Sequence, residues 1–195
     1  IQVLNDPSDP NHVVVRYGIA TQGYLFSRDG GRTFKAMCSQ AIAPMAEDKI
    51  LRLSGQRVPG AAATLLDAQG KLLVSQIGGL WTDDGTGCSW GKQPALEGMW
   101  PFSVRRDPKN ANELIAVVNA SMGEGDAITS RSTLMRRDAT GAWSSLGLLK
   151  KDQPNQRVYG NELVATTTAT GTRLYAGATI SVGALTAPQK TQILF

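Results

Sequence analysis

Charge and long apolar runs are both scarce in this sequence. Asp, Glu, Lys and Arg make up 18% of its 195 residues, below the roughly 25% of average soluble proteins. No apolar run approaches the ~18 residues of a membrane-spanning helix, so we expect no membrane span. No signal peptide is visible, but the sequence opens at residues 1–4 inside a strand-like pattern, so export stays open.

The positive charge is small and scattered. The formal net charge is +4, and the basic residues stand in short groups such as 28–35, 105–109 and 150–151, without interleaved aromatic residues. A nucleic-acid-binding surface needs a continuous basic stripe. We therefore expect these groups to be solvated turns and predict no nucleic-acid partner.

Glycine, in contrast, is abundant. The chain has 21 glycines and many Ser and Thr residues. This mixture favours short strands and tight turns over long helices, which favour Ala, Leu, Glu and Lys. The length allows a sizeable core and a single domain. The composition therefore predicts an all-β fold.

One turn segment recurs along the chain. Residues 27–34 have the form Ser-x-Asp-Gly-Gly-x-Thr-aromatic, residues 82–90 repeat it with one additional residue, and residues 136–143 repeat it in a degenerate form. The apolar residue just before each segment recurs with spacings of 55 and 54 residues. A period near 50 residues is typical of β-propellers and too long for ankyrin, TPR or leucine-rich repeats.

A second element repeats in phase with the first. Residues 3–15 and 104–116 share the order strand, Asp-Pro turn, strand, and shorter hairpins occupy the same place at 65–73 and 165–175. Asp caps its own backbone in such turns, Pro fixes φ, and Asn tolerates a positive φ. Each repeat therefore predicts four antiparallel strands, which is the composition of a propeller blade.

The predicted blades cover residues 1–38, 61–92, 102–147 and 161–195, all within one β-propeller domain. The expected strands are 1–5, 12–18, 22–27, 33–38, 61–66, 71–77, 79–82, 88–92, 102–106, 113–120, 132–137, 142–147, 161–168, 172–179 and 190–195. Residues 192–195 look like residues 23–26, so another turn segment is expected after them. A propeller closes with at least four complete blades. The ring is therefore predicted to be incomplete in this chain, with its remaining blades in a missing part of the chain or in a second chain.

The turn segment resembles the BNR/Asp-box repeat of sialidases, family 74 xyloglucan hydrolases, sortilin-type receptors and photosystem assembly factors. The resemblance implies that the Asp bonds backbone amides of its own turn, while the aromatic residue packs inward. The residues that match are Asp29, Gly31, Phe34, Asp84, Trp90, Asp138 and Trp143. We interpret the three aspartates as turn locks and not as catalytic acids. Because these proteins do unrelated jobs, the repeat implies a fold and not a function.

The predicted topology separates the turns into two faces. The tight turns between the first and second strands and between the third and fourth strands share one face. The long connections, residues 39–60, 119–131, 148–160 and 177–190, share the other. Long loops on a rigid scaffold commonly carry binding sites. The long-loop face is therefore the predicted binding face.

Two of the connections on that face end alike. Residues 56–58 and 156–158 are both Gln-Arg-Val, and they lead into first strands at the predicted channel mouth. Arg57 and Arg157, with Trp100 and Tyr159, predict a site for an anionic or sugar-like ligand, because Arg forms forked hydrogen bonds and aromatic rings stack. The alternative is that both arginines repeat because the blades do, and bond loop carbonyls.

An enzyme of the sialidase type needs an arginine triad and a Tyr–Glu pair. Residues 57–59 are similar to the Arg-Ile-Pro motif of that family, but they follow the first Asp box, where the family places the motif before it. A family 74 hydrolase needs two carboxylates across a cleft. The acids on the predicted binding face, in which no spacing marks a pair, are Glu47, Asp48, Glu97, Glu124, Asp126 and Asp152.

We predict no catalytic residue, no metal and no cofactor. The single histidine, His12, lies in an Asp-Pro turn on the face that carries the tight turns, which argues against His-based nucleophilic or metal chemistry.

Two cysteines are present, Cys38 and Cys88. Extracytoplasmic Asp-box proteins make a disulfide between them attractive, and with it an exported location. Cys38 lies nine residues past Asp29, whereas Cys88 lies four past Asp84. Five residues of strand span roughly 16 Å, against a Cα limit of about 7 Å for a bridge. A disulfide and two free thiols both stay open.

The predicted function is a non-catalytic binding module, secreted, periplasmic or on the cell surface. It would recognise a protein or a glycan on the face opposite the Asp boxes. The alternative is a glycoside hydrolase or sialidase-like enzyme whose catalytic residues lie partly outside this chain. A Tyr–Glu pair and further arginines in other blades would favour the enzyme.

Overall fold

The computed structural model describes residues 1–17, 23–38, 63–76, 78–122, 129–149, 156–182 and 190–194. These residues form antiparallel β-sheets with a single short 3₁₀ helix (Pro94–Leu96). The predicted all-β fold is therefore confirmed. The chain divides into two compact units, residues 1–97 and 98–195. None of the described segments is a helix of the length and hydrophobicity that a membrane span requires.

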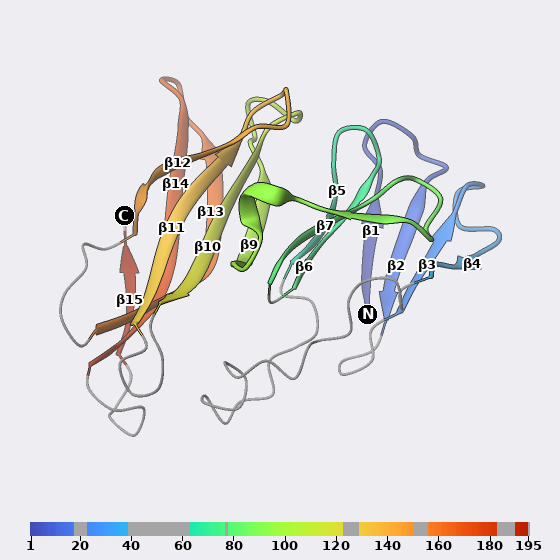
Figure 1. The fold of residues 1–195 in the computed structure, drawn as a ribbon. Helices are drawn as coiled ribbons and strands as arrows, with labels where there is room; N and C mark the ends of the chain where they lie inside the picture. The colour runs from blue at the N-terminus through green and yellow to red at the C-terminus, as the bar shows by residue number, and fades with distance from the viewer. Residues whose placement is uncertain are drawn as a thin grey trace. The chain divides into compact units, whose positions relative to one another are not determined.

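The first unit holds two four-stranded sheets, in which the strands pair in chain order (Figure 1). The strands of the first sheet are β1 (Gln2–Asn5), β2 (Val13–Tyr17), β3 (Gly23–Ser27) and β4 (Lys35–Ala36). The strands of the second sheet are β5 (Thr64–Leu66), β6 (Leu72–Gln76), β7 (Gly79–Asp83) and β8 (Trp90–Lys92).

The second unit holds a four-stranded and a three-stranded sheet, again with the strands in chain order. The third sheet contains β9 (Trp100–Arg106), β10 (Leu114–Met122), β11 (Thr129–Arg137) and β12 (Trp143–Leu148). The fourth sheet contains β13 (Gln156–Thr167), β14 (Thr172–Val182) and β15 (Lys190–Leu194).

Each expected strand has a counterpart in the structure, but several strands of the second unit are longer than expected. Strand β13 begins at Gln156, and its first five residues pair with Ala178–Val182 of β14. Residues 156–160 were expected in a connection before a strand at 161–168. Val158 and Tyr159 are strand-forming residues that continue the ladder. Trp100, also expected in a connection, is the first residue of β9.

The core of the first unit lies between its two sheets. Leu4, Val14 and Phe26 stand side by side across β1, β2 and β3. Because strand side chains alternate between faces, all three point to the same side, toward the second sheet. They pack in one cluster with residues of that sheet, chiefly Leu66, Leu72, Val74, Trp81 and Trp90.

The core of the second unit repeats this arrangement. Ile115 and Val117 of the third sheet pack against Leu163 and Ala176 of the fourth, with Leu134, Ala165 and Leu174 at the margin. In both units, one face of the earlier sheet covers the opposite face of the later one. We call the face that packs on the following sheet the forward face. The face that packs on the preceding sheet is the backward face.

Gly160 of β13 lies where the two sheets of the second unit approach closely. A Cβ atom there would lie 2.0 Å from Cγ1 of Val117, so no larger residue fits without movement. The buried amide of Asn119 both donates to the Gly160 carbonyl (3.0 Å) and accepts from its N–H (2.9 Å). Ser132 donates to Asn119 and accepts a further bond from the Gly160 N–H. These bonds satisfy polar groups that the packing buries.

Candidate functional site

The turn between β3 and β4 is closed by the side chain of Asp29. Its Oδ1 accepts the N–H of Thr33 at 2.9 Å, and its Oδ2 accepts the Thr33 hydroxyl at 2.6 Å. The hydroxyl of Ser27 donates to Asp29 and accepts the N–H of Gly31 at 2.9 Å. Gly31 has a φ of 87°. The carboxylate of Asp29 therefore accepts hydrogen bonds from its own turn.

In the turn between β7 and β8, two aspartates accept hydrogen bonds from the turn. Asp84 accepts the N–H and the hydroxyl of Thr86, at 2.8 and 2.6 Å. Asp83 is buried and accepts the N–H of Gly87 at 2.8 Å. Asp83 is the last residue of β7, as Ser27 is of β3, and both accept an N–H four residues later. Asp83 was not among the predicted residues, because an alignment of the segments on their second aspartate leaves it out, whereas an alignment on the strand end pairs it with Ser27.

The degenerate third segment keeps the same chemistry. Asp138 accepts the N–H and the hydroxyl of Thr140, at 2.9 and 2.6 Å, and the N–H of Ala142 at 3.0 Å. Asp84 and Asp138 each follow the last residue of a strand and each begin an Asp-x-Thr sequence. The shared signal is therefore Asp-x-Thr after a strand, which the sequence shows directly.

Hydrogen bonding sets the acidity of these carboxyl groups. The hydroxyl of Thr33, helped by its N–H and by Ser27, lowers the pKa of Asp29 to about 2. The Thr86 hydroxyl lowers the pKa of Asp84, and the Thr140 hydroxyl lowers that of Asp138. Burial has the opposite effect on Asp83 and raises its pKa. Bonds to a charged carboxylate favour the charged form, whereas desolvation opposes it.

The aromatic residues of the three segments have different environments. Trp90 packs on the core of the first unit, with its ring centroid 6.5 Å from that of Tyr24. Trp143 is half-buried as the first residue of β12. Phe34, which the Asp-box resemblance places inside, is 42% exposed. It precedes the two-residue strand β4 and lies over Gly31 of its own turn, so no strand directs it inward.

Cys38 and Cys88 form a disulfide, with their Cα atoms 4.5 Å apart. The N–H of Cys38 also donates to the carbonyl of Gly87 at 2.7 Å. The chain thus leaves the short strand β4 and runs beside the turn of the neighbouring sheet. The expected separation of roughly 16 Å compared positions along equivalent strands, whereas the two cysteines meet across two different sheets.

A second set of aspartates occupies the turns between first and second strands. Asp6, Asp67 and Asp107 are all buried, and each accepts the N–H of the residue two positions later, at 2.9 to 3.0 Å. The Asp6 carboxylate also lies 3.1 Å from Nδ1 of the buried His12. Although burial raises the pKa of Asp6, the bonds from Ser8 and His12 outweigh it, and the pKa is lowered.

Two of these buried aspartates, Asp6 and Asp107, also contact the sheet that follows within their own unit. Asp6 lies against Gly70 in the turn between β5 and β6, where a Cβ would be 2.1 Å from Oδ2. Gly70 has a φ of 71°, a conformation that favours glycine. In the second unit, Thr172 at the start of β14 donates to Asp107 at 2.8 Å. The same turn position thus links neighbouring sheets in both units.

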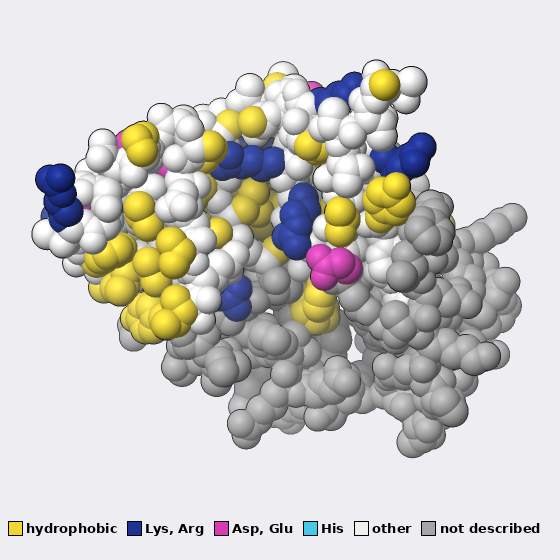
Figure 2. Space-filling model, turned by 180° about the vertical axis from the view of Figure 1, so that it is seen from behind, with side chains coloured by type: hydrophobic (Ala, Val, Ile, Leu, Met, Phe, Trp, Pro, Cys, Tyr) yellow, Lys and Arg dark blue, Asp and Glu magenta, His cyan; other side chains and the backbone are white. Residues whose placement is uncertain are grey.

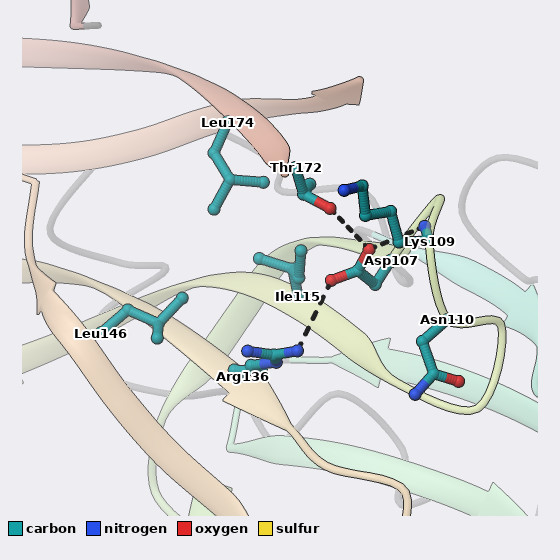
Figure 3. A pocket seen from close by; sticks show the side chains of 8 residues that line it. All are labelled: Asp107, Lys109, Asn110, Ile115, Arg136, Leu146, Thr172 and Leu174. Atoms are coloured by element: carbon teal, nitrogen blue, oxygen red, sulfur yellow. Dashed lines mark hydrogen bonds and ion pairs between the residues drawn. The ribbon is translucent and has the colours of Figure 1, made fainter. Parts of the chain in front are cut away.

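One pocket of the second unit lies beside this link (Figure 3). It encloses about 350 Å³, near the lower limit for small-ligand sites. Ile115, Leu146 and Leu174 line it on one side, and Asp107 and Arg136 lie among its polar residues. The arginine is paired with Glu113 and Asp107, so its charge is already balanced. The pocket lies at the end of the sheets that carries the tight turns.

The residues predicted to bind a ligand are described to different extents. Trp100 is half-buried at the start of β9 and makes an edge contact with Phe102 at 4.9 Å between ring centroids. Arg157 and Tyr159 lie within β13. Trp100 pairs with Asn119 of β10, and the side-chain amide of Asn119 is hydrogen-bonded to Gly160 of β13. The backbone therefore places Trp100 near Gly160, the residue that follows Tyr159. Arg57 lies outside the described residues.

Every carboxylate of the described residues has a partner in a turn or an ion pair. Asp9 accepts the N–H of Asn11, Glu97 pairs with Lys92, and Glu162 pairs with Arg105. Glu113 pairs with Arg136, and the remaining aspartates serve the turns described above. Of the acids on the predicted binding face, Glu47, Asp48, Glu124, Asp126 and Asp152 lie outside the described residues.

The charged groups show no other site among the described residues. No set of three or more His, Cys, Asp or Glu side chains in them is arranged to hold a metal ion. On the face that Figure 2 displays, the described Lys and Arg side chains stand apart in small groups.

No known protein family has a model that matches this chain, and no curated protein matches its sequence.

The low pKa of Asp29 predicts a loss of stability in acid. Because the folded state lowers this pKa from 3.8 to about 2, the stabilisation is complete above the unfolded pKa and is lost as the pH falls from about 4 towards 2. Asp29→Asn should therefore lower the melting temperature at pH 6, and the difference from the wild type should shrink by pH 2. A difference that stays constant across thermal unfolding from pH 6 to pH 2 would contradict this.

The disulfide predicts two thiols that react only after reduction. The denatured, non-reduced chain should take up no alkylating reagent, and the reduced chain should gain two adducts by intact mass. Cys38→Ser/Cys88→Ser should unfold more easily by about 2–4 kcal/mol, because the bond closes a loop of about 50 residues in the unfolded chain. Two reactive thiols in the non-reduced protein would show that the bond is absent.

Proposed function

We propose that this chain is part of an Asp-box β-propeller that works as a non-catalytic, exported binding module for a protein or a glycan. The observation that carries the proposal is the repetition of one structural unit. Antiparallel strands pair in chain order in every described sheet, and an aspartate recurs in the turn between the first and second strands of the first three sheets. Forward-on-backward sheet packing recurs in both units. Radial repetition of such sheets is the architecture of a propeller.

The binding site is proposed at the first-strand ends opposite the tight turns. Trp100 begins β9, and Arg157 and Tyr159 lie in the opening residues of β13. The sequence of residues 56–58 repeats that of 156–158, so Arg57 is the corresponding residue of an earlier repeat. Stacking by Trp and Tyr with forked bonds from Arg suits an acidic glycan best. A first strand is also a more rigid support for such side chains than a loop.

The described carboxylates support the non-catalytic form of the proposal. A hydrolase needs a pair of carboxyl groups free to act on substrate, and those of the described residues are engaged in turns and ion pairs. A hydrolase of this fold would have to use acids outside them. Export is supported by the disulfide, since such bonds persist in oxidising compartments.

The binding proposal predicts a ligand on an array of acidic and neutral glycans. Trp100→Ala and Arg157→Ala should each weaken binding about tenfold or more, as expected for an aromatic or arginine that contributes strongly to an interface. Lys109→Ala is the matched control, because Lys109 is exposed at the other end of the sheets. Unchanged binding in both site variants, or no glycan bound by the wild type, would overturn the glycan site.

A further inference from the structure

The backward face of the first sheet is apolar and partly exposed. Val3, Val15 and Leu25 stand side by side across β1, β2 and β3, on the face away from the core of the first unit. Val3 is 58% exposed and Tyr17 is 43% exposed. The ring of Tyr17 lies across Gly23, the residue it pairs with. Figure 2 shows hydrophobic side chains gathered at the surface over this sheet.

The same face of the second and fourth sheets is covered by a neighbour. In the second sheet it presents Leu66 and Leu72 to the first sheet, and in the fourth it presents Leu163 and Ala165 to the third. The turn aspartates show which faces of the two sheets correspond. Asn5, which lies on the same face as Val3, directly precedes Asp6, and Leu66 directly precedes Asp67. The backward face of the first sheet is therefore built to receive a forward face.

The fourth sheet presents an uncovered forward face. Val164, which pairs with Tyr175, points away from the core of the second unit and is 48% exposed. Arg173 and Thr166 pair beside it and are also exposed. An arginine is usual on such a face, since Arg16 lies on the forward face of the first sheet and Arg136 on that of the third. The chain thus carries both halves of the contact that its units use internally.

We infer that the backward face of the first sheet binds the forward face of the fourth sheet in a second copy of this chain. The contact joins different faces of the two copies, so it is head-to-tail, and it leads to a closed ring or to a longer assembly. Exposed apolar surface of this kind marks an interaction site. The inference deepens the propeller proposal by assigning further blades to a second copy.

Mass measurements with two complementary variants test this contact. The wild-type chain of 20.8 kDa should have a native mass of at least two chains by light scattering. Val3→Asp removes one half of the contact and Val164→Asp the other, so each variant alone should have the mass of one chain. A mixture of the two should form a two-chain complex, because each supplies the face that the other lacks.

The controls separate this contact from general stickiness and from misfolding. Leu146→Asp changes an apolar residue that is as exposed, 49%, but lies on neither face, and it should leave the wild-type mass unchanged. Circular dichroism checks folding, and Tyr17→Lys replaces Val3→Asp if that variant unfolds. A monomeric wild type, or a mixture that does not associate, would overturn the inference. Glycan binding by such a monomer would leave the proposed function standing.

Discussion

In each unit, a buried carboxylate at the turn between the first and second strands contacts the neighbouring sheet. Asp6 meets Gly70 of the next sheet, and Asp107 accepts the hydroxyl of Thr172. Both carboxylates also accept hydrogen bonds from their own turn. Thr172 of the next sheet is a further partner of the buried Asp107 carboxylate, whose burial without partners would be costly. The close approach of Asp6 leaves no room for a larger residue at Gly70, so both contacts constrain how the sheets can pack.

Because the sheets pack in this way, each sheet has a forward face and a backward face. The forward face carries Val14 in the first sheet and Ile115 in the third, and each packs on a backward face. The disulfide between Cys38 and Cys88 adds a covalent link between neighbouring sheets at the end that bears the tight turns. With that end closed by turns, the proposed binding residues lie at the other ends of the first strands.

Local chemistry explains why the strands could be predicted from the sequence. The Asp-Pro turns and the repeated Asp-box segments act within a few residues, so the ends of β1, β9 and β11 could be predicted from them. Tertiary effects were less accessible. The disulfide depends on how two sheets approach each other. The length of β13 depends on its pairing with β14, and the exposure of Phe34 depends on the shortness of β4. Asp83 was missed because the turn segments were aligned on the neighbouring Asp84. No sequence pattern indicated the contact between Gly160 and Asn119.

The link between sheets is tested most directly by a double-mutant cycle on Asp107 and Thr172. Their bond is 2.8 Å long and partly buried, so Asp107→Ala and Thr172→Val, which each remove one partner of the bond, should be coupled by about 1 kcal/mol or more in the free energy of unfolding. The double variant would then be destabilised by less than the sum of the single ones. Effects that add to within about 0.3 kcal/mol would show that this carboxylate does not join the sheets.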